Sequence, residues 1–456
     1  MAQAGSQFLS LPPDVLYVIL SYCDIRTLGR LSCVSSYFYH FLKQNCVWSQ
    51  RSRNAIATNQ LDRKVLLRSR HILGAVEKCW IALNWQKRRY SEKTLIQHYT
   101  TYMPWLFLES GTLWYSKGAT ILKLARLGNG RLAKKPVLSL RGHADDVGRF
   151  VCKNGLVVSG GKFHWQFGQP YSSVSRDTFH SFCGCSSNEV FTAMSYTLYT
   201  CKPSDGSLWI WTSSDGLYLH NRWRCHAQAI NSVDYGDYGD KVVVTGSRDR
   251  TVKVWMLHDW SSTLGYSVPV GDRVCAVSLS PCGQFFLCGS AGCNGVPPLQ
   301  LYDLGTGSRV SLLGSGYRNG AGVLHLQPES PTEVLSCGYD TFVRLWDLRC
   351  PAHSVRAWED PHDSTVYCIA SDHHMTVVSG TNRYGVVRLW DKRTTRPMQM
   401  YYVGHGNSPV YSLAFDPCYL YAALDRTLNL LSFAGATWNP ENTAADTRRS
   451  SQHSLS

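Results

Sequence analysis

The chain lacks several features that would assign it to a large class of proteins. None of its apolar runs approaches the roughly 20 residues that a membrane-spanning helix requires, so no membrane partner is expected. The apolar stretch 8–22 contains Pro12, Pro13 and Asp14 and has no basic leader, so no secretion signal is visible. The glycine-rich segment 314–320 lacks the strand–loop–helix setting of a phosphate-binding loop.

Closely spaced pairs of cysteines are also missing, although cysteine itself is abundant. Among the 17 cysteines only Cys183 and Cys185 lie close together in sequence, and no second pair completes a zinc site. Cys275, Cys288 and Cys337 fall within apolar, strand-like patterns. We therefore expect buried free thiols in a reducing compartment, the cytoplasm or the nucleus, with no metal and no cofactor.

Acidic residues are few: 32 Asp and Glu stand against 46 Lys and Arg, for a net charge of +14. Residues 51–93 hold eleven basic and three acidic residues, and the rest of the chain is only mildly basic. Apolar residues at helical intervals are interleaved with these charges, which favours a solvated basic face over a packed helical stripe. A nucleic-acid patch is the alternative. No DNA- or RNA-binding motif accompanies it, so no nucleic-acid partner is expected.

What the chain does contain is a repeated pattern of short strands separated by tight turns. The segment 226–255 runs strand, turn, strand, turn, strand, and similar segments occupy 323–346, 366–390 and 410–431. The residues that close successive repeats are spaced by 44, 47, 44, 44 and 41, and they are Trp211, Trp255, Tyr302, Trp346, Trp390 and Leu431. This period resembles the WD-repeat β-propeller, in which each repeat forms one four-stranded blade.

Polar residues recur from repeat to repeat at fixed positions. An aspartate stands six residues before the closing residue in four repeats, as Asp205, Asp249, Asp340 and Asp425. The resemblance implies that it accepts hydrogen bonds from a histidine near the repeat start, for which the candidates are His143, His226 and His405. Ser336 and Ser379 match the hydroxyl that accepts from the closing indole. Because the set recurs, it predicts a scaffold of mutually satisfied polar groups rather than a catalytic Ser-His-Asp triad.

Continuing this register predicts seven blades over residues 105–435, and hence a mainly β fold. Blade one begins near Trp105, blade two opens at His143, and blade seven ends near Phe433. Blade four departs most from the pattern, since Val296 replaces the turn aspartate and Tyr302 replaces the closing Trp.

One stretch, residues 162–204, contradicts the repeat. Blade two is regular through Gly161, and 43 residues then separate this glycine from Asp205 and the closing strand. A loop of this length inside a compact domain is uncommon. It is either a functional loop at the propeller rim or, as we favour, an in-frame insertion from retained non-coding sequence. Gly161 and Lys162 are the residues that a splice-donor sequence would encode.

Ahead of the repeats, residues 8–52 predict three short helices. Pro13 suits a first helical turn, Asp24 can cap the second helix, and Ser35 can cap the third. The order Leu-Pro-x-Asp-Val, then Asp-Ile-x-x-Leu, then a Val-Ser turn and Trp48 resembles the F-box, the module that docks on the Skp adaptor of SCF ubiquitin ligases. So small a module cannot bury all its apolar side chains internally, which indicates a partner surface.

The remaining segments connect or flank these two units. Residues 53–104 predict a basic helical linker between the F-box and the propeller. Residues 1–7 and 436–456 are polar and predict disordered ends.

F-box, helical linker and seven-bladed propeller, in this order, resemble the F-box/WD-repeat substrate receptors of SCF ligases. The resemblance implies a protein that is not an enzyme: its F-box binds the Skp adaptor and the cullin-based ligase, and its propeller presents a protein substrate for ubiquitination and degradation. The adaptor contacts it implies are Leu11, Pro12, Leu16, Ile19, Leu20, Leu28, Leu31, Val34 and Trp48. The alternatives are an interaction scaffold not coupled to ubiquitin transfer and a propeller that binds nucleic acid.

Partners of propellers usually dock on the face where each blade begins its innermost strand and makes its b–c turn. The repeat register places six candidate substrate-binding residues there: Asn231, Arg248, Tyr339, Tyr367, Arg383 and Tyr411. Arg248 matches the arginines with which phosphodegron-reading relatives bind phosphate, and one arginine makes a weak phosphate pocket. An aromatic-lined peptide site is at least as well supported.

Overall fold

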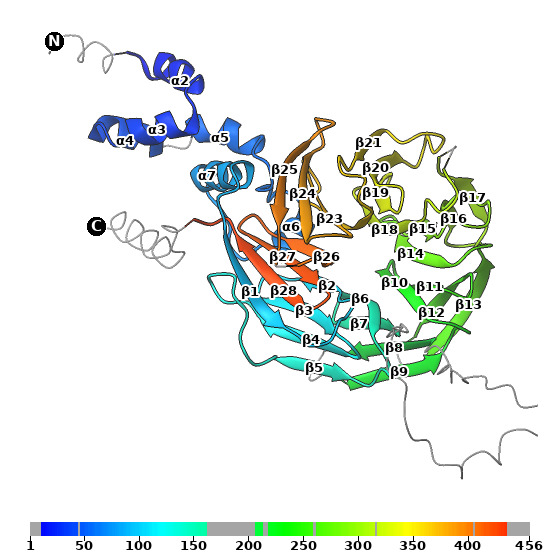
Figure 1. The fold of residues 1–456 in the computed structure, drawn as a ribbon. Coiled ribbons are helices and arrows are strands. Elements are labelled where there is room, and N and C mark those ends of the chain that lie inside the picture. The colour runs from blue at the N-terminus through cyan, green and yellow to red at the C-terminus, as the bar shows by residue number, and fades with distance from the viewer. Residues whose placement is uncertain are drawn as a thin grey trace, which may run out of the picture.

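The computed structural model describes residues 11–43, 46–161, 206–212, 218–258, 261–314, 317–404 and 406–435. It places a small bundle of helices beside a ring of seven four-stranded β-sheets, as the sequence predicts (Figure 1). The expected disordered ends and the stretch 162–204 lie outside the described residues, as do Asp205 and His405.

Six blades are built from four strands that follow one another in sequence, and each strand pairs antiparallel with the next. Blade one contains β2 (Leu106–Leu108), β3 (Thr112–Lys117), β4 (Thr120–Ala125) and β5 (Leu138–Arg141). Blade two contains β6 (Val147–Lys153), β7 (Leu156–Gly161), β8 (Ser207–Thr212) and β9 (Tyr218–Arg224). Blade three contains β10 (Ile230–Asp237), β11 (Lys241–Ser247), β12 (Thr251–Leu257) and β13 (Ser262–Pro269). Blade four contains β14 (Val274–Leu279), β15 (Phe285–Ser290), β16 (Leu299–Asp303) and β17 (Arg309–Leu312). Blade five contains β18 (Val323–Pro328), β19 (Glu333–Gly338), β20 (Phe342–Asp347) and β21 (Arg356–Glu359). Blade six contains β22 (Val366–Ser371), β23 (Thr376–Thr381), β24 (Val386–Asp391) and β25 (Pro397–Tyr402).

Blade seven closes the ring with strands from both ends of the chain. It combines β26 (Val410–Phe415), β27 (Tyr419–Leu424) and β28 (Thr427–Ser432) with β1 (Ser91–Gln97), which pairs antiparallel with β28. The prediction of a helical linker through residue 104 is therefore wrong for this segment, which is the outer strand of a blade. The sequence hides it because most of β1 is exposed, so it shows no apolar alternation.

The middle strands of the blades are buried on both faces because each blade is covered by its neighbours. Every residue of β23, β24 and β27 is buried. Such strands are rich in apolar residues, with single buried polar residues such as Ser379 and Arg388 among them, and this pattern allowed the blades to be counted from the sequence.

The predicted polar scaffold is complete in blade three. His226 Nδ1 lies 2.9 Å from Asp249 Oδ2, and His226 Nε2 lies 2.8 Å from Thr245 Oγ1. Trp255 Nε1 donates to the same hydroxyl at 3.1 Å. In blades five and six the closing indoles donate to the predicted hydroxyls at 2.8 Å, Trp346 to Ser336 and Trp390 to Ser379.

Blade five differs at its turn aspartate. Asp340 forms an ion pair with Arg344, which takes the place of a histidine partner. The arginine is on the adjacent strand β20, so the carboxylate is satisfied within one hairpin.

Blade two keeps its central hairpin across the stretch that interrupts the repeat. β7 and β8 pair antiparallel from Leu156 with Thr212 to Gly160 with Leu208. The equivalent pairing in blade three ends with Gly246 opposite Val252. Gly161 therefore ends the second strand of this hairpin, and Ser207 begins the third. In the sequence, residues 162–204 lie between these two strands, at the position of the b–c turn.

The N-terminal module consists of α2 (Pro13–Ser21), α3 (Ile25–Leu31), α4 (Ser36–Lys43) and α5 (Cys46–Arg53), one helix more than predicted. Asp24 caps α3 by accepting from the Thr27 amide at 2.6 Å, and this hydrogen bond lowers the pKa of the Asp24 carboxyl. Arg51 donates to the carbonyls of Leu20 and Ser21 at the end of α2. The arginine thus adds a donor to the carbonyls at the end of α2, where the Leu20 carbonyl also accepts from the Cys23 amide at 3.2 Å.

The linker contributes two further helices, α6 (Arg63–Arg68) and α7 (Ala75–Gln86). One side of α7 completes the core of the N-terminal module, where Cys79 is buried beside Trp48. The other side packs on the propeller through Trp85, whose indole stacks on Phe433 at 3.7 Å between centroids and donates to the Pro417 carbonyl at 2.8 Å. Helix α7 therefore packs against both the module and the propeller (Figure 1).

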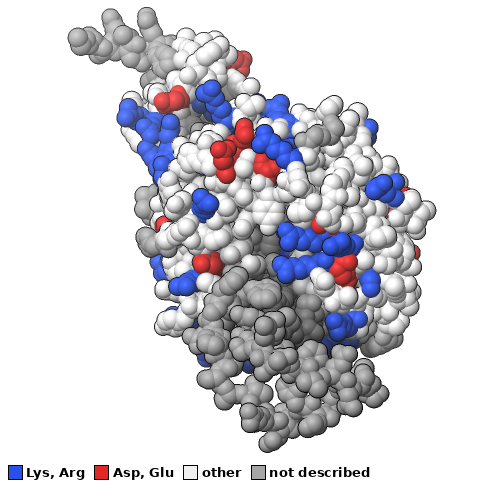
Figure 2. All heavy atoms as spheres, turned by 45° about the vertical axis from the view of Figure 1, so that its right-hand side comes forward, with Lys and Arg blue, Asp and Glu red and all other residues white. Residues whose placement is uncertain are grey.

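Helix α6 crosses the propeller face where the innermost strands end. Lys64 Nζ lies 3.4 Å from the Pro328 carbonyl at the end of β18, and Arg68 donates to the Ser371 carbonyl at the end of β22 at 2.6 Å. Part of the basic character of the linker is thus used in contacts within the chain. In Figure 2, Lys and Arg side chains form several separate groups over the helical module and the propeller, with acidic side chains among them.

Candidate functional site

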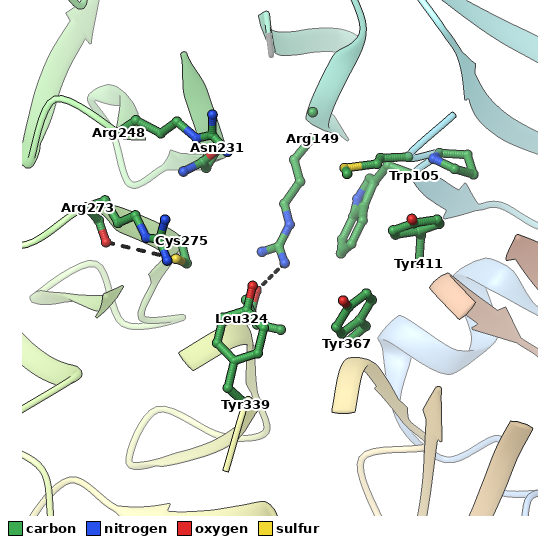
Figure 3. Close-up of a pocket in the computed structure, with 13 residues that line it drawn as sticks. Trp105, Arg149, Asn231, Arg248, Arg273, Cys275, Leu324, Tyr339, Tyr367 and Tyr411 are labelled. Carbon is green, nitrogen blue, oxygen red and sulfur yellow. Dashed lines mark hydrogen bonds between the residues drawn. The ribbon is translucent and has the colours of Figure 1, made fainter. Parts of the chain in front are cut away.

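A hollow of about 320 Å³ opens where the innermost strands of the propeller begin, on the face opposite α6. Its wall contains the second residue of several innermost strands, and the b–c turns of blades three and five contribute to its mouth. The residues that line it are Met103, Pro104, Trp105, Gly148, Arg149, Asn231, Arg248, Arg273, Cys275, Leu324, Tyr339, Tyr367 and Tyr411 (Figure 3). We call it the axial pocket.

Arg149 forms the centre of this pocket. It belongs to β6 of blade two, and it donates to the Leu324 carbonyl of blade five and lies 3.4 Å from Ser232 Oγ of blade three. Its guanidinium therefore crosses the propeller axis and lies 4.3 Å from the centroid of the Trp105 ring. Burial lowers the pKa of Arg149 to about 10, because removal of water disfavours the charged form.

One side of the axial pocket is basic. Arg248 comes from the b–c turn of blade three, Arg273 precedes the innermost strand of blade four, and both side chains lie on the same side of Arg149 in Figure 3. Within the part of the chain that the structure describes, none of the three arginines forms an ion pair with a carboxylate.

The carboxylates nearest in sequence to these arginines are engaged elsewhere. Asp249 bonds to His226, and Asp272 accepts from the backbone amides of Arg273 and Cys293, both at 2.7 Å. The charges of Arg248 and Arg273 are therefore directed at the pocket without an internal counter-ion among the described residues.

The opposite side of the axial pocket is aromatic. Tyr367 and Tyr411 stand on neighbouring innermost strands with ring centroids 5.8 Å apart and an interplanar angle of 36°. Trp105 continues this wall, and Tyr339 reaches in from the b–c turn of blade five (Figure 3). Burial raises the pKa of Tyr411 to about 12 and raises that of Tyr367, so both hydroxyls are neutral donors at physiological pH.

Five of the six substrate-binding residues predicted from the sequence line the pocket together: Asn231, Arg248, Tyr339, Tyr367 and Tyr411. Arg383 does not line it and is exposed in the β23–β24 turn. This turn is one residue longer than that of blade three, because Gly380 pairs with Val387 where Gly246 pairs with Val252. The extra residue takes Arg383 out of the register that brings Arg248 to the pocket.

Three residues that dominate the pocket were absent from the prediction. Arg149 stands one position beyond the strand site that the repeat register marks, which in blade two is Gly148. Its signal was present, because an arginine interrupts the otherwise apolar strand from Val147 to Cys152. Trp105 and Arg273 lie in the segments that lead into innermost strands, where the repeat pattern carries no signal.

A second candidate surface lies on α2. Its exposed apolar side chains are Val15, Val18, Ile19 and Tyr22, at spacings that place them on one helical face, and Tyr22 is 86% exposed. Pro12 lies one turn earlier and is also exposed, and Val34, in the turn after α3, is 71% exposed. Leu11 and Leu31 are partly buried.

Four further residues were predicted from the sequence to contact the adaptor, but the structure places them inside the helical module. Leu16, Leu20, Leu28 and Trp48 are buried in the module's own core. They hold the helices together and are not available to a partner. Val15, Val18 and Tyr22 were missed because the apolar residues of α2 occupy two faces, and the sequence alone does not tell which face is covered.

Two kinds of site find no support in the described part of the chain. Its histidines, cysteines and acidic residues form no group of three that could hold a metal ion. Across the same residues, no helix has the length and apolar character needed to cross a membrane.

A helical module with an exposed apolar face, joined to a seven-bladed propeller with a pocket on its axis, defines a binding protein of the F-box and WD-repeat class. Residues 8–54 match the F-box-like family model, and residues 218–256 match the model of the WD domain, G-beta repeat. The WD40 β-propeller domain of Doa1 superposes with a TM-score of 0.53 at 17% identity, over 75% of this chain and 97% of that one, which supports the propeller fold alone.

The chain is 32% identical over 440 residues to F-box/WD repeat-containing protein 4 of Homo sapiens, known as dactylin, covering 94% of each chain. It is likewise 32% identical to the Mus musculus protein of the same name, over 93% of this chain and 92% of that one. The chain therefore belongs to the F-box/WD-repeat family and resembles dactylin in particular.

Proposed function

We propose that this protein is the non-catalytic substrate-recognition subunit of an SCF-type E3 ubiquitin ligase, acting in the cytoplasm or the nucleus. Its F-box binds the Skp adaptor and, through it, the cullin-based ligase, while its propeller holds a protein substrate for ubiquitination and degradation. The observation that carries the proposal is the pairing of two recognition surfaces on one packed chain. The exposed apolar face of α2 suits an adaptor, and the axial pocket suits a substrate peptide.

The linker supports this division of roles. Helix α7 is buried against the F-box core on one side and against Phe433 on the other, so no free hinge separates the two units. After β1, the linker returns to the pocket face, where the amides of His98 and Tyr102 bond to the β27–β28 turn at 2.7 and 2.8 Å. It then supplies Met103, Pro104 and Trp105 to the pocket. A substrate bound there is held at a fixed place relative to the ligase.

The axial pocket favours a peptide that carries negative charge beside an aromatic or aliphatic side chain. Arg248 and Arg273 supply charge-assisted hydrogen bonds, and Tyr367 with Tyr411 supplies apolar contact area and two donors. Aromatic and arginine side chains are the residue types that contribute most to protein interfaces.

The alternatives are less well supported. A scaffold unrelated to ubiquitin would use the same pocket but would not need the apolar face of α2. A nucleic-acid-binding role would favour a continuous basic surface, whereas Arg51 and Arg68 bond within the chain and the visible basic groups are separate (Figure 2).

Affinity purification of the full chain tests the proposal. The double variant Val15→Asp/Ile19→Asp should lose the Skp adaptor and the cullin while retaining the proteins that bind the propeller. Leu264→Asp, at an exposed apolar residue of β13, is the matched control and should retain both. Undiminished recovery of the adaptor with the double variant would refute the α2 face as the adaptor surface. Recovery of propeller partners without adaptor or cullin from the unaltered chain would favour a scaffold.

A further inference from the structure

The axial pocket presents a combination of groups that narrows the chemistry of its ligand. Arg149 occupies the centre with its guanidinium against Trp105, Arg248 and Arg273 lie on one side, and Tyr367 and Tyr411 lie on the other (Figure 3). A ligand that satisfies both sides must present more than one negative charge and a flat apolar surface, one to each wall.

The basic side calls for a dianion. Three guanidiniums converge on a hollow of about 320 Å³, and none has a carboxylate partner among the residues that the structure describes. Arginine presents its donors in a fixed fork that matches the oxygens of a phosphate group. A single carboxylate would engage one arginine in two hydrogen bonds and leave the other two positive charges without a negative partner.

The aromatic side calls for a ring. Ring pairs are favourable at centroid separations of roughly 4.5–7 Å in tilted or offset arrangements. Tyr367 and Tyr411 already adopt such a pairing with each other at 5.8 Å, and together with Trp105 they line the side of the pocket that a third ring would contact. A phosphoserine has no ring and carries its phosphate close to the backbone, so it would leave this surface in water.

Gly148 favours a long side chain. It is the blade-two member of the ring of positions that holds Asn231, Cys275, Leu324, Tyr367 and Tyr411 in blades three to seven. Gly148 adds no side chain to the pocket wall, and Arg149, the adjacent residue on β6, lines the same pocket. The phosphate of a phosphotyrosine, at the far end of a ring, is placed to reach this central arginine.

We propose that the axial pocket binds a phosphotyrosine side chain of the protein substrate, with the ring against Trp105, Tyr367 and Tyr411 and the phosphate on Arg149, Arg248 and Arg273. This inference rests on the proposed function, because it assumes that the pocket receives a protein substrate. A nucleotide also combines a ring with phosphate, and it serves as a competing ligand in the test.

The test uses the full chain co-purified with its Skp adaptor, and isothermal titration with phenyl phosphate, O-phosphoserine, inorganic phosphate and AMP. Phenyl phosphate should bind about three- to tenfold more tightly than inorganic phosphate or O-phosphoserine, the equivalent of one aromatic pair. Degenerate peptide pools centred on phosphotyrosine, phosphoserine or tyrosine should show the same order. Equal affinities, tighter binding of AMP, or no binding of phenyl phosphate would each overturn the proposal.

Variants separate the two walls. Arg248→Gln and Arg273→Gln should each weaken phenyl phosphate about tenfold or more, since a charged hydrogen bond is removed. Tyr367→Ala with Tyr411→Ala should abolish the preference for phenyl phosphate and leave inorganic phosphate unaffected. Arg383→Gln, at an exposed arginine outside the pocket, is the matched control and should change nothing. A preference that survives loss of both tyrosines would contradict recognition of the ring.

The same preparation distinguishes failure of this inference from failure of the proposed function. Recovery of the adaptor together with absence of aryl phosphate binding would reject phosphotyrosine and leave the ligase role standing. Loss of the adaptor would reject the ligase role, whatever the pocket binds.

Discussion

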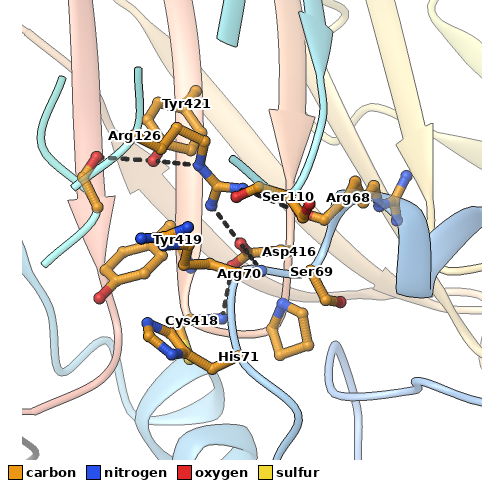
Figure 4. A network of polar contacts seen from close by, with 12 residues as sticks. Arg68, Ser69, Arg70, His71, Ser110, Arg126, Asp416, Cys418, Tyr419 and Tyr421 are labelled. Carbon is orange, nitrogen blue, oxygen red and sulfur yellow. Dashed lines mark hydrogen bonds and ion pairs between the residues drawn. The ribbon is translucent and has the colours of Figure 1, made fainter. Parts of the chain in front are cut away.

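Arg126 and Asp416 form a buried ion pair at the seam where the propeller closes, with side chains 0% and 2% exposed (Figure 4). The arginine follows β4 of blade one and the aspartate follows β26 of blade seven. Arg126 Nη1 also donates to the Arg68 carbonyl of the linker at 2.9 Å, and the Arg70 amide lies 3.3 Å from Asp416. The pair therefore joins the first blade, the last blade and the linker.

Arg126→Met should destabilise the chain by about 3–5 kcal/mol, because it leaves the Asp416 carboxylate buried without its partner. Denaturant unfolding followed by tryptophan fluorescence measures the change. Arg349→Met, which removes a surface ion pair with Asp347, is the control and should leave the midpoint nearly unchanged. Similar unfolding midpoints for the two variants would show that the Arg126–Asp416 ion pair contributes little to the stability of the propeller.

The two faces of α2 should respond differently to truncation. Leu16→Ala removes a fully buried side chain and should cost about 2–5 kcal/mol of stability. Ile19→Ala removes a side chain from the exposed face, and it should leave stability nearly unchanged while weakening adaptor binding by about 2 kcal/mol. Thermal melts and titration with the Skp adaptor measure the two effects. The reverse assignment of effects would place the adaptor on another face.

The outer strand β1 makes a prediction about domain boundaries. A fragment that begins at residue 105 lacks β1 and leaves β28 as an open edge, so it should aggregate or melt early. A fragment of residues 54–435 retains the strand and Trp85, and it should melt cooperatively at a higher temperature. Equal melting of both fragments would mean that β1 contributes little to closure.

The Asp249 carboxylate in the polar scaffold of blade three should make the stability of the protein depend on pH. Burial opposes ionisation of Asp249, but hydrogen bonds from His226 and Thr251 prevail and lower its pKa in the folded state. Stability from this group is therefore present above the unfolded pKa of about 3.9 and is lost as the pH falls further. Asp249→Asn should cost about 1–3 kcal/mol at pH 7, and the difference from the parent should shrink below about pH 4.

Urea unfolding at several pH values measures this dependence. Asp237→Asn, at an exposed aspartate of the same blade, is the control and should show no such convergence. A cost of Asp249→Asn that stays constant down to pH 3 would show that the carboxylate's charge is not what stabilises the blade.

Removal of residues 162–203 should preserve the fold, because it joins Gly161 to Ser204 and gives blade two the hairpin length of blade three. The flanking strands already pair in that register. The entropic penalty of a long loop grows only logarithmically with its length, so the melting temperature should change little or rise. Failure of the shortened chain to fold would show that the stretch is an integral element.

Sequencing of transcripts tests the origin of residues 162–204, since their presence in every transcript would argue against a retained intron.

The sequence alone determined the architecture of this protein because the architecture repeats. A closing residue every 41–47 positions, most often Trp, marks the blades, and four of these residues have an aspartate such as Asp249 six positions earlier. The same repeat register predicted five of the residues that line the axial pocket, because equivalent positions of successive blades lie around one axis.

Tertiary structure decided whatever does not repeat. β1 is joined to blade seven across more than three hundred residues, and its polar sequence carries no local sign of this. Arg149 becomes the centre of the pocket only through contacts across the ring, with the Leu324 carbonyl of blade five and the Trp105 ring. The two faces of α2 are both apolar, and packing against α5 and α7 settled which face is covered and which is left for a partner.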